Sequence, residues 1–172
     1  RWGSPLDVLR IGDILVALAQ SGRISSSHLG TPCQSWTLAR SPALRTAEYP
    51  EGRPDLSEAE LWVATTGNAL AAFTIRFARA LYDVAAFFSV ENPWKSWLWL
   101  LSGMRALRAL TGVAMARVTH NSFGTIYLKP LGILHNTPTL HRLKDGDGSS
   151  VEIDRSVVLR GWTRCNGARV QK

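Results

Sequence analysis

Hydrophobic and polar positions along the chain predict a succession of helices and strands. Between Asp7 and Gln20 the apolar residues recur three and four positions apart, which is the spacing of an amphipathic helix. A second helical pattern covers residues 57–82, where Ser57 and Glu60 have the spacing of a capping box. The remaining predicted elements are a helix over 95–110 and strands over 24–29, 85–90, 113–119 and 126–135.

The order of these elements is helix, strand, helix, strand, helix, strand, strand. Such alternation is typical of an α/β fold, with a mostly parallel sheet and helices on both faces. The run 85–90 is apolar on both faces, as in a buried parallel strand, and Asn92-Pro93 has the residue types of a helix N-cap and first position. In such a fold, ligands bind beyond the carboxyl ends of the strands.

Composition narrows the class of protein. The chain has 172 residues, and 20 Lys plus Arg against 13 Asp plus Glu give a net charge of +7. This length suits one domain, and the positive charge favours polyanionic partners such as nucleic acid or an anionic membrane without choosing between them. The two cysteines, Cys33 and Cys165, exclude a disulfide scaffold and a four-cysteine zinc site. Metal-ligand spacing is also absent from the four histidines, His28, His120, His135 and His141, which we interpret as ordinary polar or core residues.

No apolar stretch reaches the ~20 residues that a membrane-spanning helix needs, and no signal-peptide pattern opens the chain. We therefore expect a soluble intracellular protein, nuclear if its source is a eukaryote. The chain opens on Arg1 without an initiator Met, so we expect a piece of a longer protein or a processed product.

One candidate for chemistry lies in the long polar loop over 30–54, directly after a predicted strand. Cys33 lies in this loop with Arg40 and Arg45 nearby. Positive charge favours the thiolate, which is the nucleophilic form of cysteine. Loops of this length inside a compact domain are usually functional or mobile. The alternative is a buried loop cysteine with no role.

A second candidate is Glu91, at the end of the apolar run 85–90. A carboxylate in this place is poorly solvated, which favours its protonated form and suits a proton donor. The alternative is that Glu91 caps the following helix, where the helix dipole stabilises a carboxylate. We interpret the tryptophans that follow, Trp94, Trp97 and Trp99, as packing residues rather than as a base-stacking platform.

Both candidates belong to short motifs that resemble those of the DNA cytosine-5 methyltransferases. Pro32-Cys33-Gln34 resembles the catalytic motif of that family, and Glu91-Asn92 resembles its Glu-Asn motif. The resemblance is closer to a divergent branch that is often associated with transposons or viruses, and it covers about residues 5–136. The matching residues are Pro32-Cys33, Ser35, Ala39-Arg40, Glu91-Asn92-Pro93, Ser96, Leu98-Trp99, Asn121 with Phe123-Gly124, and Lys129-Pro130.

The resemblance implies a partial Rossmann-like methyltransferase fold over residues 1–136, with 137–172 as a basic C-terminal extension. It implies transfer of a methyl group from S-adenosylmethionine to C5 of a cytosine flipped out of DNA. It assigns to Cys33 the thiolate that adds at C6, and to Glu91 the acid at ring N3. No metal is implied.

The same resemblance implies which residues contact the substrate. Either Arg40 or Lys129 would supply a cation beside the base. The loop 30–54, with Arg40, Arg45 and Arg53, is the candidate lid over the base. The substrate-binding residues implied are Pro32, Gln34, Ser35, Arg40, Asn92 and Lys129.

The chain departs from the family at the methyl-donor site. No Gly-rich turn precedes Cys33, so we expect the donor-binding start to be missing from this chain. Asp7 or Asp13 is the candidate for the acidic residue that contacts the donor adenine, and the alternative for both is a helix N-terminal carboxylate. A non-catalytic nucleic-acid-binding remnant is the alternative function. A third candidate is a cysteine hydrolase that uses Cys33 and a histidine such as His120, and no other feature of the sequence supports it.

Overall fold

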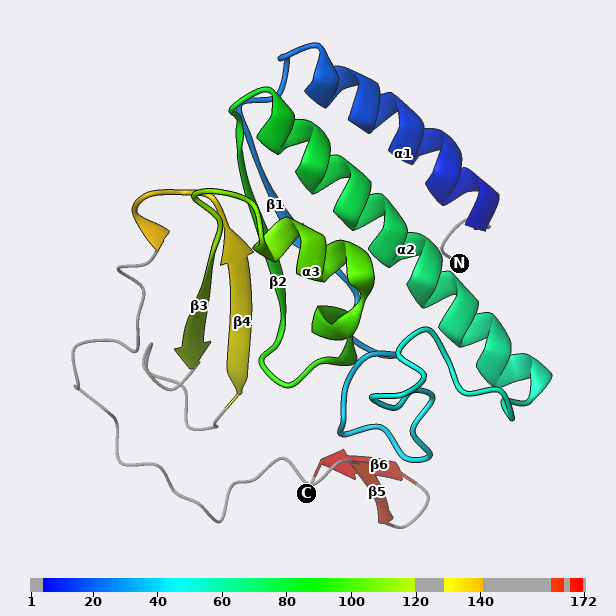
Figure 1. The fold of residues 1–172 in the computed structure, drawn as a ribbon. Helices are drawn as coiled ribbons and strands as arrows, with labels where there is room; N and C mark the ends of the chain where they lie inside the picture. The colour runs from blue at the N-terminus through cyan, green and yellow to red at the C-terminus, as the bar shows by residue number, and fades with distance from the viewer. Residues whose placement is uncertain (1–4, 120–128, 141–161, 166–167, 172) are drawn as a thin grey trace.

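A computed structural model of the protein describes residues 5–119, 129–140, 162–165 and 168–171 (Figure 1). The predicted order of helices and strands is confirmed through residue 135, and the chain has an α/β fold. The elements are α1 (Pro5–Gln20), β1 (Ser26–Gly30), α2 (Glu58–Asp83), β2 (Phe87–Pro93), the 3-10 helix η1 (Trp97–Leu100), α3 (Ser102–Arg108), β3 (Ala114–Thr119), β4 (Pro130–His135), β5 (Trp162–Cys165) and β6 (Ala168–Gln171).

Strands β1 to β4 form one mixed sheet in the order β1-β2-β4-β3. β1 is parallel to β2, whereas β4 is antiparallel to both β2 and β3. The prediction of a mostly parallel sheet is therefore wrong. Parallel strands need a crossover connection of a dozen or more residues, and only residues 120–129 separate β3 from β4. β3 still runs in the same direction as β1 and β2, because it too is antiparallel to β4.

The core lies between this sheet and α2. Phe88 and Val90 of β2 and Leu134 of β4 are at most 1% exposed, and they share one face of the sheet. Side chains of α2, η1 and α3 pack with them in a single cluster, and α1 packs on α2. Figure 1 shows α2 lying between α1 and the strands β3 and β4. The helical members of the cluster include Ala71, Phe77, Ala78, Leu81, Leu98, Met104 and Leu107.

The opposite face of the sheet is open at β1 and buried at β3 and β4, where Ala116, Val118 and His135 are at most 6% exposed. Ser26, His28 and Gly30 of β1 are exposed, and Phe87 of β2 is 43% exposed. In the described part of the chain α2 and α3 pack on the face of Val90, and helices on the opposite face stay a prediction. The run 85–90 is apolar except for Ser89, but only alternate residues of it face the helices.

The capping box of α2 is confirmed. The backbone N–H of Ser57 donates a hydrogen bond to the Glu60 carboxylate at 3.0 Å, and the helix begins at the next residue. α2 ends at Asp83, one residue beyond the end that the apolar spacing predicts.

The segment after β2 differs from the prediction. Asn92 and Pro93 are the last residues of β2 and not the start of a helix. Ser96 caps the next helical turn, because its Oγ accepts a hydrogen bond from the Leu98 N–H at 3.2 Å. Leu101 has an extended backbone (φ −58°, ψ 137°), and this divides the helix predicted over 95–110 into η1 and α3.

Two further strands lie in the predicted C-terminal extension. β5 and β6 form an antiparallel pair, with Trp162 opposite Gln171. The division of the chain at residues 136 and 137 stays a prediction. Among the helices that the structure describes, none is long and apolar enough to cross a membrane.

Candidate active site

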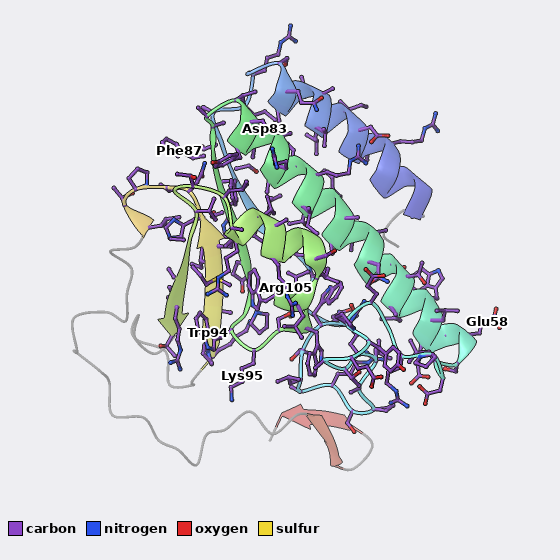
Figure 2. All side chains as sticks on the ribbon, in the orientation of Figure 1. Glu58, Asp83, Phe87, Trp94, Lys95 and Arg105 are labelled. Atoms are coloured by element: carbon purple, nitrogen blue, oxygen red, sulfur yellow. The ribbon has the colours of Figure 1, made fainter. Side chains whose placement is uncertain are left out.

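The described parts of the motifs singled out in the sequence lie near one edge of the sheet. β1, β2 and β3 run in the same direction, so their carboxyl ends share an edge, and the antiparallel β4 begins there. Gly30, the last residue of β1, is paired with Glu91, and Cys33 follows three residues later. Lys129 immediately precedes β4 at the same edge. Figure 2 shows Phe87 at the start of β2, and Trp94 and Lys95 beyond its other end.

Cys33 lies in a closed turn. Its carbonyl oxygen accepts hydrogen bonds from the backbone N–H groups of Trp36 and Thr37, each at 3.0 Å. The thiol is free and partly exposed. Pro32 and Gln34 on either side are exposed, so the neighbours of the thiol are open to solvent.

Ser35 is the buried member of this turn. Its carbonyl oxygen and its hydroxyl oxygen both accept hydrogen bonds from Arg45, at 3.0 and 3.2 Å. The hydroxyl that the resemblance assigns to substrate is therefore engaged within the protein. A role of Ser35 in substrate binding stays a prediction.

Glu91 and Asn92 point to opposite faces of the sheet, because successive strand residues alternate. Asn92 is fully buried, and its Nδ2 donates a hydrogen bond to the Thr31 carbonyl at 2.7 Å, which ties the end of β2 to the residue after β1. Its Oδ1 has no hydrogen-bond partner among the described residues. Asn92 therefore positions the two strand ends, and a contact with substrate stays a prediction.

The Glu91 carboxylate is partly exposed, and in the described part of the chain it has no hydrogen-bond or ion-pair partner. The alternative interpretation, that Glu91 caps a helix, is wrong because Glu91 lies inside β2 and the following N-cap is Ser96. An acid at this place is available to a ligand at the sheet edge. The prediction that the Cys33 sulfur and this carboxylate face one crevice stays a prediction.

The three arginines of the loop over residues 31–56 have different environments. Arg40 is partly buried, and its Nε has no hydrogen-bond partner among the described residues. Arg53 forms an exposed ion pair with Asp55, and this pairing lowers the pKa of the Asp55 carboxyl. Arg45 is fully buried. The interpretation of Arg45 as a cation of a mobile lid is therefore wrong, because it is not accessible to a phosphate.

The two residues proposed for the methyl donor, Asp7 and Asp13, both lie on α1. Asp13 lies on α1, and its carboxylate accepts a hydrogen bond from Arg76 of α2 at 2.6 Å on the protein surface. Asp7 lies in the first half of α1, and its side chain is outside the described part of the structure. A contact of Asp7 or Asp13 with S-adenosylmethionine stays a prediction.

Of the four histidines, two lie within the described residues. His28 Nδ1 lies 2.8 Å from Ser89 Oγ on the neighbouring strand, and His135 is buried. His120, His141 and the Asn121 to Gly124 motif lie outside the described residues. Among the residues described, no group of three or more His, Cys, Asp and Glu side chains is placed to hold a metal ion.

Tryptophans pack around the site, as the sequence predicts. Trp36 is fully buried, and the Trp97 N–H donates to its carbonyl at 3.0 Å. Trp97 and Trp99 pack against the core cluster, and Trp99 Nε1 donates to the Pro93 carbonyl at 2.9 Å. Trp94 stacks with Arg117 of β3, whose guanidinium carbon lies 5.7 Å from the ring centre.

Sequence reasoning missed Gly67 and Asn68, which border the Cys33 turn, and it named Arg45 only as a cation near Cys33 and in the candidate lid. An added Cβ at Gly67 would lie 2.9 Å from Arg45 Nη2 and would overlap Ser35 Oγ. A glycine and an asparagine in the middle of a long helix are the signal that could have found this contact, because both weaken a helix unless packing requires them.

No family model, curated protein or solved structure matches the chain.

Proposed function

We propose that this chain carries the base-attacking part of a DNA cytosine-5 methyltransferase. Cys33 would add to C6 of a cytosine flipped out of the nucleic acid, and Glu91 would protonate ring N3. The observation that carries the proposal is the parallel pairing of β1 with β2, which sets Gly30 opposite Glu91 and starts the Cys33 loop beside it. Cys33 and Glu91 are 58 positions apart in the sequence, yet they lie near the ends of adjacent strands at one edge of the sheet.

The chemistry needs both groups together. The Cys33 thiolate gives an electron pair to C6, the C5–C6 π electrons shift toward C4 and N3, and N3 takes the proton of Glu91. The ring is then an enamine with a nucleophilic C5. If C5 takes a proton from water, the hydroxide that remains removes either C5 hydrogen as a proton. The N3 proton then returns to Glu91 and expulsion of the thiolate restores cytosine.

The resemblance implies S-adenosylmethionine as the source of the methyl group. The pairing of Asp13 with Arg76 does not support a donor site within the described residues. The activity proposed for this chain as it stands is therefore exchange of the cytosine C5 hydrogen with water, which uses only the groups at the sheet edge.

Exposed cations support a nucleic-acid substrate. Lys95 follows β2, Lys129 precedes β4, and both are exposed at the edge that carries Cys33. Phosphate contacts through lysine release counterions, so affinity for DNA should fall steeply as salt rises. Extruding the base costs a few kcal/mol, which such contacts would offset.

The test is release of tritium from DNA of random sequence that carries [5-³H]cytosine. The unaltered chain should release tritium into water without any methyl donor, and Cys33→Ala should abolish the release. Cys165→Ala is the matched control and should retain it, because the second cysteine has no part in the proposal. Release that survives Cys33→Ala would assign the nucleophile to another residue and contradict the proposal.

A nucleic-acid-binding remnant is the second candidate, and the engagement of Asp13 by Arg76 favours it. The same experiment separates the two. Salt-sensitive DNA binding with no release of tritium would identify a binding module, whereas release that depends on Cys33 would identify a catalytic one.

A further inference from the structure

Arg45 is a buried cation that uses every one of its hydrogen-bond donors. A guanidinium has five N–H groups, and here all five have acceptors. Nε donates to the Ser35 carbonyl and Nη2 to the Ser35 hydroxyl. Nη2 also donates to the Ala64 carbonyl at 2.8 Å. Nη1 donates to the Pro50 carbonyl at 2.8 Å and to Asn68 Oδ1 at 2.7 Å.

None of these acceptors is a carboxylate. Burial lowers the pKa of Arg45 to about 10, opposed by the charge of Glu51. The guanidinium also lies over the Trp36 ring, with its carbon 3.4 Å from the ring centre. Burying a charge without an ion-pair partner is costly, so hydrogen bonds and stacking must hold this group in place.

The acceptors come from three segments that are separate in the sequence. Ser35 and Trp36 belong to the turn that begins at Cys33, Pro50 lies farther along the same loop, and Ala64 and Asn68 belong to α2. Arg45 therefore joins the Cys33 turn to the helix that packs on the sheet. The lack of a side chain at Gly67 leaves the space that this junction occupies.

We propose that Arg45 is a positioning residue, which fixes the turn over residues 33–37 against α2 and so holds the Cys33 thiol at the sheet edge. It acts through Ser35 and Trp36 and does not touch the reacting base. This inference rests on the proposed function for its catalytic consequence. The fixing of the turn can be tested without that function.

The primary variants are Arg45→Met, which removes the donors but keeps a long side chain, and Arg45→Lys, which keeps the charge. Hydrogen exchange at the Trp36 and Thr37 amides is the first readout, because these groups donate to the Cys33 carbonyl. In both variants we expect these two amides to exchange at least about tenfold faster while core amides stay protected. The control is Arg53→Met, which removes a partly exposed arginine of the same loop that donates to the Ala43 carbonyl and to Asp55 but not to the Cys33 turn, and it should leave both amides unchanged.

Tritium release is the second readout. A misplacement of about 1 Å lowers rates on the order of 10²-fold, so both Arg45 variants should lose that much turnover with little change in the KM for DNA. Full turnover in Arg45→Lys would show that a positive charge at this position is enough to hold the turn, and it would overturn the proposal. Unchanged amide protection in Arg45→Met would overturn it as well.

Two outcomes keep the inference distinct from the proposed function. If the unaltered chain releases no tritium, the proposed function fails, and the amide exchange still decides whether Arg45 fixes the turn. If Arg45→Met does not fold, Asn68→Ala removes a single acceptor and should accelerate the same two amides to a smaller extent. Unchanged amides in a folded Asn68→Ala chain would then contradict the proposal.

Discussion

Two segments leave the sheet at the same edge, and they are held by different means. The loop over residues 31–56 runs from β1 to α2 without a helix or strand. The buried Arg45 guanidinium donates hydrogen bonds to two of its carbonyl oxygens, those of Ser35 and Pro50. The segment over residues 94–101 is short and forms η1, and its own backbone and tryptophans hold it against the strands. A long irregular loop such as the one that holds Cys33 can therefore be fixed when one side chain with many donors supplies hydrogen bonds to its acceptors.

The two segments should also differ in what their mutations change. In the proposal, the first segment supplies the nucleophile Cys33, and the acid Glu91 lies in β2, just before the second segment. Variants in the two regions should therefore differ in how strongly they change turnover and stability. The following predictions run from the largest expected effect to the smallest.

Glu91→Gln should lower tritium release by on the order of 10²–10⁴-fold, because the amide cannot deliver a proton to N3. It should leave DNA binding nearly unchanged, since phosphate contacts carry most of the affinity. Measuring turnover and binding on the same DNA separates the two effects. Equal turnover of Glu91→Gln and the unaltered chain would show that Glu91 has no part in the chemistry.

Gly67→Ala should weaken the first segment strongly. The new methyl group would overlap Ser35 Oγ and approach Arg45 Nη2 to 2.9 Å, so we expect a loss of roughly 2–3 kcal/mol in the free energy of unfolding. Urea unfolding measures this loss. Gly30→Ala is the control, because no atom lies within 4 Å of its added Cβ, and it should stay within about 0.5 kcal/mol.

Gly132→Ala tests the packing of the second segment. Its Cβ would lie 3.2 Å from Trp99 Cζ2 and 3.4 Å from both Trp94 Cε3 and Met115 Sδ. These side chains can shift by a few tenths of an ångström, so the expected loss is about 1 kcal/mol. A loss larger than that of Gly67→Ala in the same urea series would reverse the comparison between the two segments.

Ser57→Ala removes the cap where the first loop enters α2, at a cost of about 1 kcal/mol. Ser102→Ala, in the first turn of α3, removes a serine that is not the N-cap and should cost less than about 0.5 kcal/mol. Thermal melts of both variants measure the difference. Equal losses would show that the capping box contributes nothing.

The stability that this capping box contributes should depend on pH. Hydrogen bonds from Ser57 hold the pKa of Glu60 below its ordinary value of 4.5. A lowered folded-state pKa means that this stabilisation is complete above 4.5 and is lost as the pH falls through the lowered value. The difference in stability between Ser57→Ala and the unaltered chain should therefore narrow in that acid range.

Local patterns predicted the parts of the fold that depend on neighbours in sequence. The apolar spacing over 7–20 and the Ser57 and Glu60 pair locate α1 and the start of α2, because both signals are contained within a few helical turns. The position of Cys33 just after β1 also follows from the order of elements, whereas Glu91, predicted to follow a strand, lies inside β2.

Contacts between distant segments decided what the sequence did not predict. β2 continues to Pro93 because it pairs with β4, and Asn92 reaches Thr31 across the sheet edge. The composition of a loop does not distinguish a buried arginine from an exposed one, so Arg45 and Arg53 are alike in sequence and opposite in environment. The resemblance named Cys33 and Glu91, but it did not name the residues that fix them.

The central claim is that Cys33 forms a bond to C6 of a pyrimidine base. It is tested most directly by incubating the full chain with random-sequence DNA in which 2-pyrimidinone replaces cytosine, since loss of the 4-amino group makes C6 more electrophilic. Mass spectrometry of the digested complex should find the nucleotide attached to Cys33, and the adduct should be absent from Cys33→Ala and present in Cys165→Ala. An adduct on any other residue, or none at all, would contradict the account.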